Sequence, residues 1–203
     1  MFITFEGGEG CGKSTQAKLL KEYLESKSKK VALTREPGGT EFAEKLREVL
    51  LSGEGISDPL TEFLLLSVAR RDHVINFIKP KLADGEVVIS DRFIDSSFVY
   101  QGYLKKLPLN VIEQITGLSI GNFMPDITLF LNIDPEISMK RVLENRQVQT
   151  YYDKKDISFH TKINDSFLDL AKKYKSRIKV MDAAGSQEEV FERIKNVIDE
   201  KIK

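Results

Sequence analysis

The chain has 203 residues, 41% hydrophobic and 31% charged, which is typical of one globular domain with a full hydrophobic core. Its 31 basic and 31 acidic residues balance, and this excludes the strongly basic surface of a general nucleic-acid binder. No apolar run approaches the ~20 residues that cross a bilayer, and a single cysteine, Cys11, excludes an intrachain disulfide. With no basic leader or cleavage signal at the N-terminus, we expect one cytoplasmic domain over residues 1–203 that binds neither membranes nor nucleic acids.

Short apolar runs alternate along the chain with segments of helical periodicity, which predicts a parallel sheet with crossover helices. Strands are expected at 2–5, 31–34, 86–90, 127–133 and 177–182. Helices are expected at 13–26, 40–51, 60–78, 95–101, 109–120 and 135–145, with a last one that carries Val190, Ile194, Val197, Ile198 and Ile202 on one face. Pro80 is expected to close the helix at 60–78. The stretch 146–156, RQVQTYYDKKD, is polar and lacks periodicity, so we expect a mobile lid there.

Residues 7–14, GGEGCGKS, follow the first strand and fit the pattern G-x-x-x-x-G-K-[ST]. Glycines allow the backbone N–H groups to point at phosphate oxygens, and the following helix adds its N-terminal amides and dipole. Lys13 is predicted to reach the β- and γ-phosphates, and the Ser14 hydroxyl to ligate Mg²⁺. A glycine turn without a ligand is the alternative, but lysine, hydroxyl, strand and helix together argue against it. The predicted ATP-binding residues here are Gly7, Gly8, Glu9, Gly10, Cys11, Gly12, Lys13, Ser14 and Thr15, with Cys11 as a small filler.

Asp91 and Arg92 directly follow the third expected strand. In a P-loop protein, an acid at this place supports Mg²⁺, often through water. The neighbouring arginine can offer two donors to an acceptor phosphate. A local salt bridge between the two residues is the alternative interpretation. We therefore predict Asp91 as a metal-supporting residue and Arg92 as the group that holds the acceptor.

Three further stretches, TREPGGT at 34–40, LLLSVARRDH at 64–73 and DRFIDSSFVYQG at 91–102, accompany EGGEGCGKS. Together they resemble the motifs of thymidylate kinase, in that family's order and spacing. The resemblance implies an α/β fold, the three-layer P-loop nucleotide-kinase fold with a five-stranded parallel sheet and a lid at about 146–156. It also implies ATP- and Mg²⁺-dependent phosphorylation of dTMP to dTDP in dTTP synthesis, by a homodimer. The helices at 40–51 and 60–78 are the candidate dimer interface.

The resemblance also assigns substrate contacts. Glu36 would lie near the sugar 3′-hydroxyl and the metal, and Arg70, one helical turn after Leu66, would donate to thymine O4 while the base rests on Leu66. Tyr100 would pack under the deoxyribose and leave little room for a 2′-hydroxyl, and Gln101 has a donor and an acceptor for the base edge. The further matching positions are Arg47, Arg92 and Ser97 for dTMP and Arg141 for ATP. For Leu66 core packing is the alternative, and for Arg47 a solvated helix arginine.

The lid departs from the family pattern. With an acidic residue such as Glu9 in the loop, the resemblance implies a lid arginine over the transferring group, but Tyr151 stands at that position. Our hypothesis is that Arg146 supplies the missing charge; Lys154 and Lys155 are alternatives, as are solvated lid charges without a role. The predicted catalytic residues are Lys13, Arg92, Asp91, Glu36 and Arg146. Because an ionised phosphate oxygen is the nucleophile, no general base is needed, and the two histidines are predicted to be structural or surface residues.

Three other functions compete with this interpretation. A nucleotide kinase for UMP, CMP or another deoxynucleotide is disfavoured by TREPGGT and SSFVYQG. A switch GTPase needs a guanine-reading N-K-x-D, and the corresponding segment reads LNIDPE without the lysine. A relative that binds nucleotides with slow turnover is left open by the altered lid.

Overall fold

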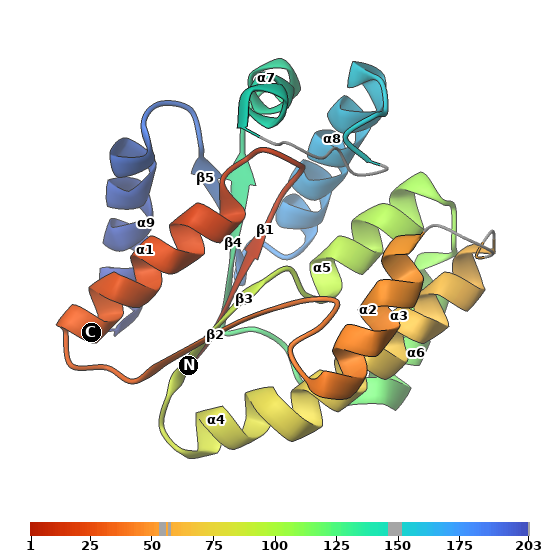
Figure 1. The fold of residues 1–203 in the computed structure, drawn as a ribbon, viewed down its shortest axis with the longest axis horizontal. Coiled ribbons are helices and arrows are strands. Elements are labelled where there is room, and N and C mark those ends of the chain that lie inside the picture. The colour runs from red at the N-terminus through yellow and green to blue at the C-terminus, as the bar shows by residue number, and fades with distance from the viewer. Residues whose placement is uncertain (53–55, 57, 146–151, 203) are drawn as a thin grey trace.

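The structure, a computed structural model, describes residues 1–52, 56, 58–145 and 152–202 of the chain. Its centre is an all-parallel sheet in the order β2-β3-β1-β4-β5 (Figure 1). The strands are β1 (Phe2–Glu6), β2 (Val31–Arg35), β3 (Val87–Asp91), β4 (Ile127–Asn132) and β5 (Ile178–Asp182). This confirms the predicted α/β fold, and every expected strand forms within one or two residues of its predicted bounds.

Helices cover both faces of the sheet, as Figure 1 shows. One face carries α1 (Lys13–Ser26) and α9 (Gln187–Ile202), and the other faces α3 (Pro59–His73), α6 (Leu109–Ile120) and α8 (Ile157–Lys173). The remaining elements are α2 (Glu41–Ser52), η1 (Val74–Ile78), α4 (Lys79–Ala83), α5 (Ile94–Ser97), η2 (Phe98–Leu104) and α7 (Pro135–Asn145). In the described part of the chain, no helix has the length and hydrophobicity needed to span a membrane.

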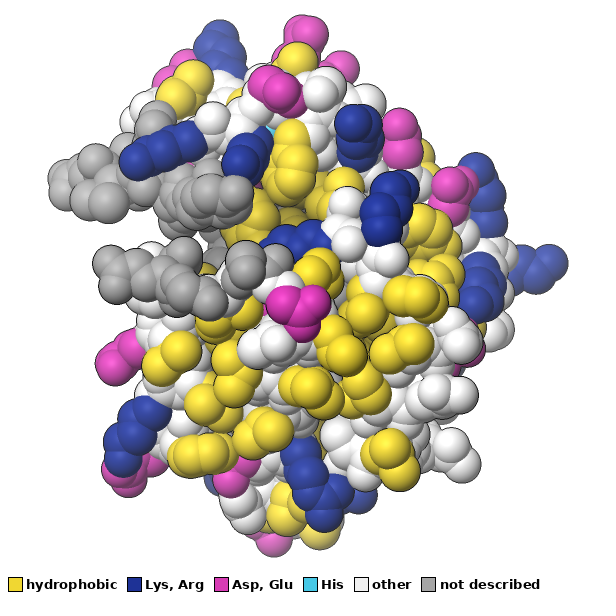
Figure 2. Space-filling model, turned by 90° about the vertical axis from the view of Figure 1, so that its right-hand side faces the viewer, with side chains coloured by type: hydrophobic (Ala, Val, Ile, Leu, Met, Phe, Trp, Pro, Cys, Tyr) yellow, Lys and Arg dark blue, Asp and Glu magenta, His cyan; other side chains and the backbone are white. Residues whose placement is uncertain are grey.

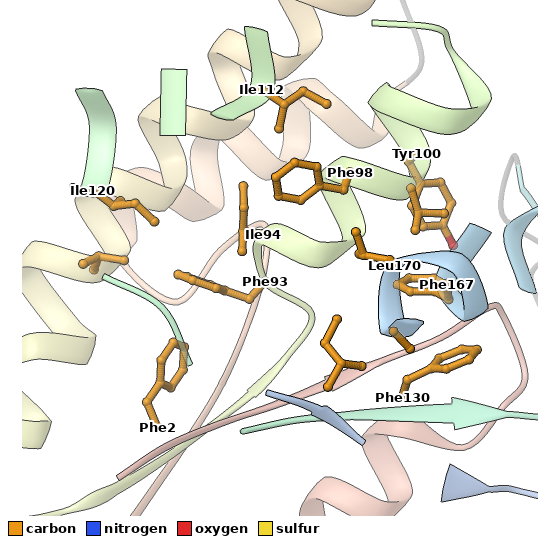
Figure 3. Close-up of a cluster of buried hydrophobic side chains, with 14 of the residues drawn as sticks. Phe2, Phe93, Ile94, Phe98, Tyr100, Ile112, Ile120, Phe130, Phe167 and Leu170 are labelled. Atoms are coloured by element: carbon orange, nitrogen blue, oxygen red, sulfur yellow. The ribbon is translucent and has the colours of Figure 1, made fainter. Parts of the chain in front are cut away.

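Strand alternation divides the core into two clusters, because successive side chains point to opposite faces of a sheet. Ile3 and Phe5 of β1 pack with α1 and α9 in one cluster, whereas Phe2 belongs to the other. In that second cluster, Phe130 of β4 stacks on Phe167 of α8 with ring centroids 5.1 Å apart (Figure 3). The same alternation places Thr4 and Glu6 on the face of Phe2, where both are buried.

The prediction that Pro80 closes the helix at 60–78 is wrong. The helix widens into the π-helical segment η1 after His73 and continues as α4 to Ala83. Proline removes an N–H group and its ring clashes with the preceding helical turn. The Lys79 N–H bonds to the Val74 carbonyl five residues earlier, so the wider turn relieves this clash. The expected helix at 95–101 likewise forms as α5 followed by the π-helical η2.

Candidate functional site

The predicted phosphate-binding loop connects β1 to α1, at the sheet edge where the carboxyl ends of the parallel strands meet. Gly10 has a φ of 72°, and a Cβ there would lie 2.2 Å from the Ser138 carbonyl oxygen of α7. Only glycine therefore fits the close contact between this loop and α7. Cys11 is buried, with its sulfur 3.6 Å from Lys13 Nζ, in keeping with a filler of the loop interior.

Lys13 curls back into the loop. Its Nζ donates to the carbonyl oxygens of Gly7 at 3.1 Å and Gly8 at 2.7 Å, so the charge lies where the loop would enclose phosphate oxygens. The next residue, Ser14, donates from its Oγ to Asp91 Oδ2 at 2.5 Å. A hydroxyl and one carboxylate are hard oxygen ligands that suit Mg²⁺, which usually completes its shell with phosphate and water. The described residues contain no group of three or more acidic, His or Cys side chains suited to a metal.

Arg92 reaches from the end of β3 to the phosphate-binding loop. Its Nη2 donates to Glu9 Oε1 at 2.6 Å, and its Nη1 donates to the Gly7 carbonyl at 3.2 Å and to Ser96 Oγ at 3.1 Å. The guanidinium also lies over the Tyr100 ring, 5.2 Å from its centroid. The salt-bridge partner of Arg92 is thus Glu9 across the loop, and the alternative of a local pair with Asp91 is not observed.

Glu36, Arg70 and Ser97 form one buried network on the other side of Arg92. Arg70 Nε donates to Glu36 Oε2 at 2.7 Å and its Nη2 to Ser97 Oγ at 3.1 Å, and Arg70 is only 3% exposed. Within the described residues, Arg70 Nη1 is buried and has no partner. A buried donor without a partner is rare, because it costs ~1–3 kcal/mol. This atom is therefore available for a ligand acceptor.

His73 completes this network, in keeping with the structural role predicted for it. Its Nδ1 lies 3.1 Å from Glu36 Oε1 and its Nε2 2.8 Å from Thr34 Oγ1. A carboxylate can only accept, so Nδ1 donates to Glu36. Its link to Glu36 was not foreseen. The available signal was its spacing of three residues after Arg70, which places both on one helix face.

Gln101 and Tyr100 are buried on η2, beside the same network. Gln101 Nε2 donates to Glu62 Oε1 at 2.9 Å, and Lys105 pairs with the other Glu62 oxygen. The Tyr100 hydroxyl is buried without a partner among the described residues, and burial raises its pKa. Its ring packs against Tyr152, 5.3 Å between centroids.

The surroundings of Leu66 and Arg47 do not match the alternatives considered for them, which were core packing for Leu66 and a solvated helix position for Arg47. Leu66 is half-buried and belongs to neither core cluster, so core packing does not account for it. Arg47 Nη1 donates to the Pro37 carbonyl at 2.6 Å, and burial and the neighbouring Arg35 lower the pKa of its guanidinium. Arg47 is therefore drawn to the loop after β2 and is not a fully solvated helix residue.

Comparisons with known proteins decide the family. A family model described as thymidylate kinase matches residues 5–194. The chain is 42% identical to the thymidylate kinase of Shouchella clausii over 94% of this chain and 91% of that protein. It is 40% identical to that of Gloeobacter violaceus over 98% of this chain and 94% of that protein. The crystal structure of thymidylate kinase from Ehrlichia chaffeensis matches with a TM-score of 0.79 and 37% identity, covering 98% of each chain.

The chain belongs to the thymidylate kinase family. The resemblance drawn from its motifs is thereby confirmed, as is the P-loop kinase fold. The roles of individual residues of this chain stay predictions.

The predicted ATP contact Arg141 lies on α7, one turn after Ser138. Its guanidinium donates to the carbonyl oxygens of Ala183 at 3.3 Å and Gly185 at 3.0 Å, in the loop after β5. Arg141 thus joins that loop to the helix that contacts Gly10.

The lid of this thymidylate kinase is described only in part. Arg146 and Tyr151 lie outside the described residues, so the proposed lid cation and its replacement have no geometry here. Tyr152, at the described end of the lid, stacks on Phe159 of α8 with ring planes 9° apart. Asp156 caps α8 by accepting from the Phe159 N–H at 2.9 Å.

We predict that His73 matters for the acceptor substrate through Glu36. In His73→Asn, the side-chain nitrogen lies about where Nδ1 lies and can still donate to Glu36. In His73→Gln, the amide reaches toward Thr34 instead and leaves Glu36 without this donor. Because a hydrogen bond to a charged group is worth several-fold to tenfold or more in binding, we expect His73→Gln to raise the KM for dTMP about tenfold. His73→Asn should stay within about threefold of wild type.

Steady-state kinetics at saturating ATP checks this, with the KM for ATP as the internal control. Equal KM values for dTMP in the two variants would contradict a role that depends on the contact with Glu36.

Proposed function

We propose that this chain transfers the γ-phosphoryl group of ATP to dTMP, with Mg²⁺, and so produces dTDP for dTTP synthesis. The observation that carries the proposal is the place of Arg92. It contacts the phosphate-binding loop through Gly7 and Glu9, and it lies over the ring of Tyr100, which adjoins Gln101 on η2. A donor and an acceptor phosphate would therefore meet at one guanidinium.

On the donor side, the chain supplies positioning and positive charge. The amides of the loop and the N-terminus of α1 would hold the ATP phosphates, with Lys13 at the β- and γ-phosphates. Ser14 and Asp91 would hold Mg²⁺, which when bound neutralises charge on the donor phosphates. Arg141 and Thr15 are proposed to border the ATP site. No base is needed, since the attacking oxygen of dTMP is already ionised.

On the acceptor side, the pocket has the donor and acceptor pattern of thymine. Arg70 Nη1 is a buried donor without a partner, suited to O4. Gln101 Nε2 donates to Glu62, which leaves the oxygen of the same amide to accept from the N3–H of the base. Cytosine presents an amino donor and a bare N3 at these two places and would reverse both contacts. Tyr100 and Leu66 would bound the sugar and the base face, with Glu36, Arg47 and Ser97 around them.

An acceptor panel tests the proposed function. With Mg²⁺ and ATP in excess, we compare kcat/KM for dTMP, dUMP, dCMP and UMP. A polar site rejects analogues that leave its buried groups unpaired by ~10⁴-fold, whereas loss of one methyl group costs only ~10–100-fold. We therefore expect kcat/KM to be highest for dTMP and second highest for dUMP. For dCMP we expect a value lower by three orders of magnitude or more, because the base would lose its contacts with both Arg70 and Gln101. Preference for another acceptor, or ADP release that ignores dTMP, would overturn the proposal.

For the lid we propose that Arg146 supplies the charge over the transferring group, and that residues 1–203 act as one kinase domain with this lid at 146–156. The support is chemical: the family's lid arginine is replaced by Tyr151, and Arg146 begins the same segment. Removing one such donor typically lowers the chemical rate ~10²–10³-fold.

Single-turnover quench-flow on Arg146→Ala should show a loss of this order, with Lys154→Ala and Lys155→Ala as matched controls of the same lid. A rate within about threefold of wild type for Arg146→Ala would remove this residue from the mechanism.

We also propose a homodimer in the cytoplasm, formed through a surface that we call the α2–α3 face: Phe42, Val49, Leu60, Leu64 and Val68. These side chains are 37–49% exposed although they are large and apolar. Figure 2 looks onto this side of the molecule and shows hydrophobic side chains gathered across it. A cluster of this kind usually marks an interface. The cytoplasmic location rests on the single cysteine, which suits a reducing compartment.

Val68→Asp tests the dimer. Because a charge at the centre of an apolar interface is left unpaired on association, this variant should run as a monomer by light scattering coupled to size exclusion. Leu143→Asp on α7 is the matched control: Leu143 is 62% exposed and lies on a different helix, so the dimer should persist. A dimer that survives Val68→Asp at micromolar concentration would exclude this face.

A further inference from the structure

The last residue of β1, Glu6, is a carboxylate with 0% exposure. The position directly precedes the phosphate-binding loop, and strand alternation turns its side chain toward α5. A buried charge is costly unless hydrogen bonds compensate for it. The hydrogen-bond partners of Glu6 therefore indicate its role.

Three donors from one short segment hold this carboxylate. Oε1 accepts from the backbone N–H groups of Phe93 at 2.8 Å and Ser96 at 3.2 Å, and Oε2 accepts from Ser96 Oγ at 2.6 Å. The Ser96 hydroxyl has a single proton, which is directed at Glu6. Its oxygen is then left to accept from Arg92 Nη1 at 3.1 Å. Glu6 thus fixes the orientation of the hydroxyl that orients Arg92.

The backbone of Arg92 depends on the same residue. Arg92 has a φ of 73°, a conformation that costs a non-glycine residue ~1–3 kcal/mol and persists only when its surroundings hold it. The Arg92 N–H donates to the Phe5 carbonyl at 2.9 Å, and the following N–H, of Phe93, donates to Glu6. The end of β1 therefore holds the peptide groups on both sides of the strained residue.

We propose that Glu6 is a positioning residue for phosphoryl transfer: through Ser96 it sets the guanidinium of Arg92 for the acceptor phosphate. Glu6 itself does not reach the substrate. The inference rests on the proposed function, because it takes from it the role of Arg92.

The charges around Glu6 support this assignment. Asp95 of α5 is the acid whose charge acts on Glu6, and Arg177 binds both Asp95 oxygens, at 2.5 and 2.7 Å. Arg177 pairs with Asp95 and also acts on Glu6 through its charge, whereas Arg92 is joined to Glu6 through the Ser96 hydroxyl. Burial, and then Asp95, raise the pKa of Glu6 to about 7, while Arg92 and the hydrogen bonds lower it.

The test uses the isosteric variant Glu6→Gln. Its oxygen can still accept from the two backbone N–H groups, but its Nε2 donates where Oε2 accepted. Ser96 Oγ then meets two donors, the amide and Arg92, and its own proton loses its acceptor. We expect the KM for dTMP to rise about tenfold and kcat to fall, with the KM for ATP within about twofold of wild type.

Two further variants separate positioning from general stability. If Glu6 acts through Ser96, the double variant Glu6→Gln/Ser96→Ala should be no worse than Ser96→Ala alone. Thr4→Val is the control for loss of a buried hydroxyl on the same strand face: Thr4 bonds to Thr128 at 2.7 Å, and Thr128 bonds in turn to Asp95 and Arg177 but, among the described residues, not to Ser96 or Arg92. It should lower the melting temperature and leave the ratio of the KM values for dTMP and ATP unchanged.

The pH dependence gives a third readout. Protonated Glu6 presents an O–H to Ser96, as the glutamine presents an N–H. The difference in dTMP KM between wild type and Glu6→Gln should therefore be largest above pH 8 and shrink as the pH falls through about 7, the pKa to which burial and Asp95 raise the wild-type carboxyl. Ionisation of the dTMP phosphate is common to both enzymes and cancels in the ratio.

Unchanged dTMP kinetics in folded Glu6→Gln, additive effects in the double variant, or equal rises of both KM values would each overturn the proposal. If Glu6→Gln does not fold, Ser96→Ala is compared with Thr4→Val. We then expect Ser96→Ala to raise the KM for dTMP but not that for ATP, and Thr4→Val to leave their ratio unchanged. Arg92→Ala in the same assays separates this inference from its premise: if it leaves the KM for dTMP unchanged, the role of Arg92 in the proposed function is wrong.

Discussion

The site depends on one strained residue held between two strands. Arg92 follows β3 with a left-handed backbone, and its peptide neighbours are tied to Phe5 and Glu6 of β1. Without that turn, the chain would leave the sheet in another direction, and the guanidinium would not face Glu9 and Gly7. Because β1 and β3 are adjacent and parallel, with Phe5 paired to Asp91, the loop that would hold ATP and the arginine that would hold dTMP start from one point.

Buried charges fix this geometry more than they stabilise the fold. Glu36 with Arg70, and Asp95 with Arg177, are pairs whose desolvation offsets most of their attraction, so apolar replacements of similar shape would serve stability as well. Such pairs fix the orientation of the arginine side chains. Asp95 engages Arg177 with both oxygens, whereas Glu36 uses one oxygen for Arg70 and the other for His73. Each guanidinium is thereby left with a defined orientation.

Local patterns predicted what depends on neighbours in sequence. The strands, the phosphate-binding loop and the placement of Ser14 and Asp91 at the carboxyl edge of the sheet follow from apolar runs, glycines and their order. The contacts that join Glu6 to Ser96, 90 residues apart, or Arg70 to Glu36, 34 apart, have no local signature beyond a charge in an apolar context. The continuation of the helix through Pro80 was missed because a π-helical turn depends on packing around Val74 and Ile78 and not on helix propensity.

In the proposed acceptor site, selectivity for the base would come from polar atoms that the protein leaves without a partner. Among the described residues, five buried side-chain atoms have no partner, and two of them, Arg70 Nη1 and the Tyr100 hydroxyl, belong to residues assigned to that site. Each lowers the stability of the folded chain by ~1–3 kcal/mol until something pairs with it. The neighbouring atoms of Arg70 are already bound by Glu36 and Ser97, so the guanidinium cannot turn to satisfy Nη1 within the protein. Glu62 restrains the Gln101 amide in the same way. A base with an acceptor beside a donor would bind Arg70 Nη1 and the Gln101 amide oxygen without rearranging either side chain. A base with the reverse pattern would place a donor against the Arg70 donor and an acceptor against the Gln101 acceptor.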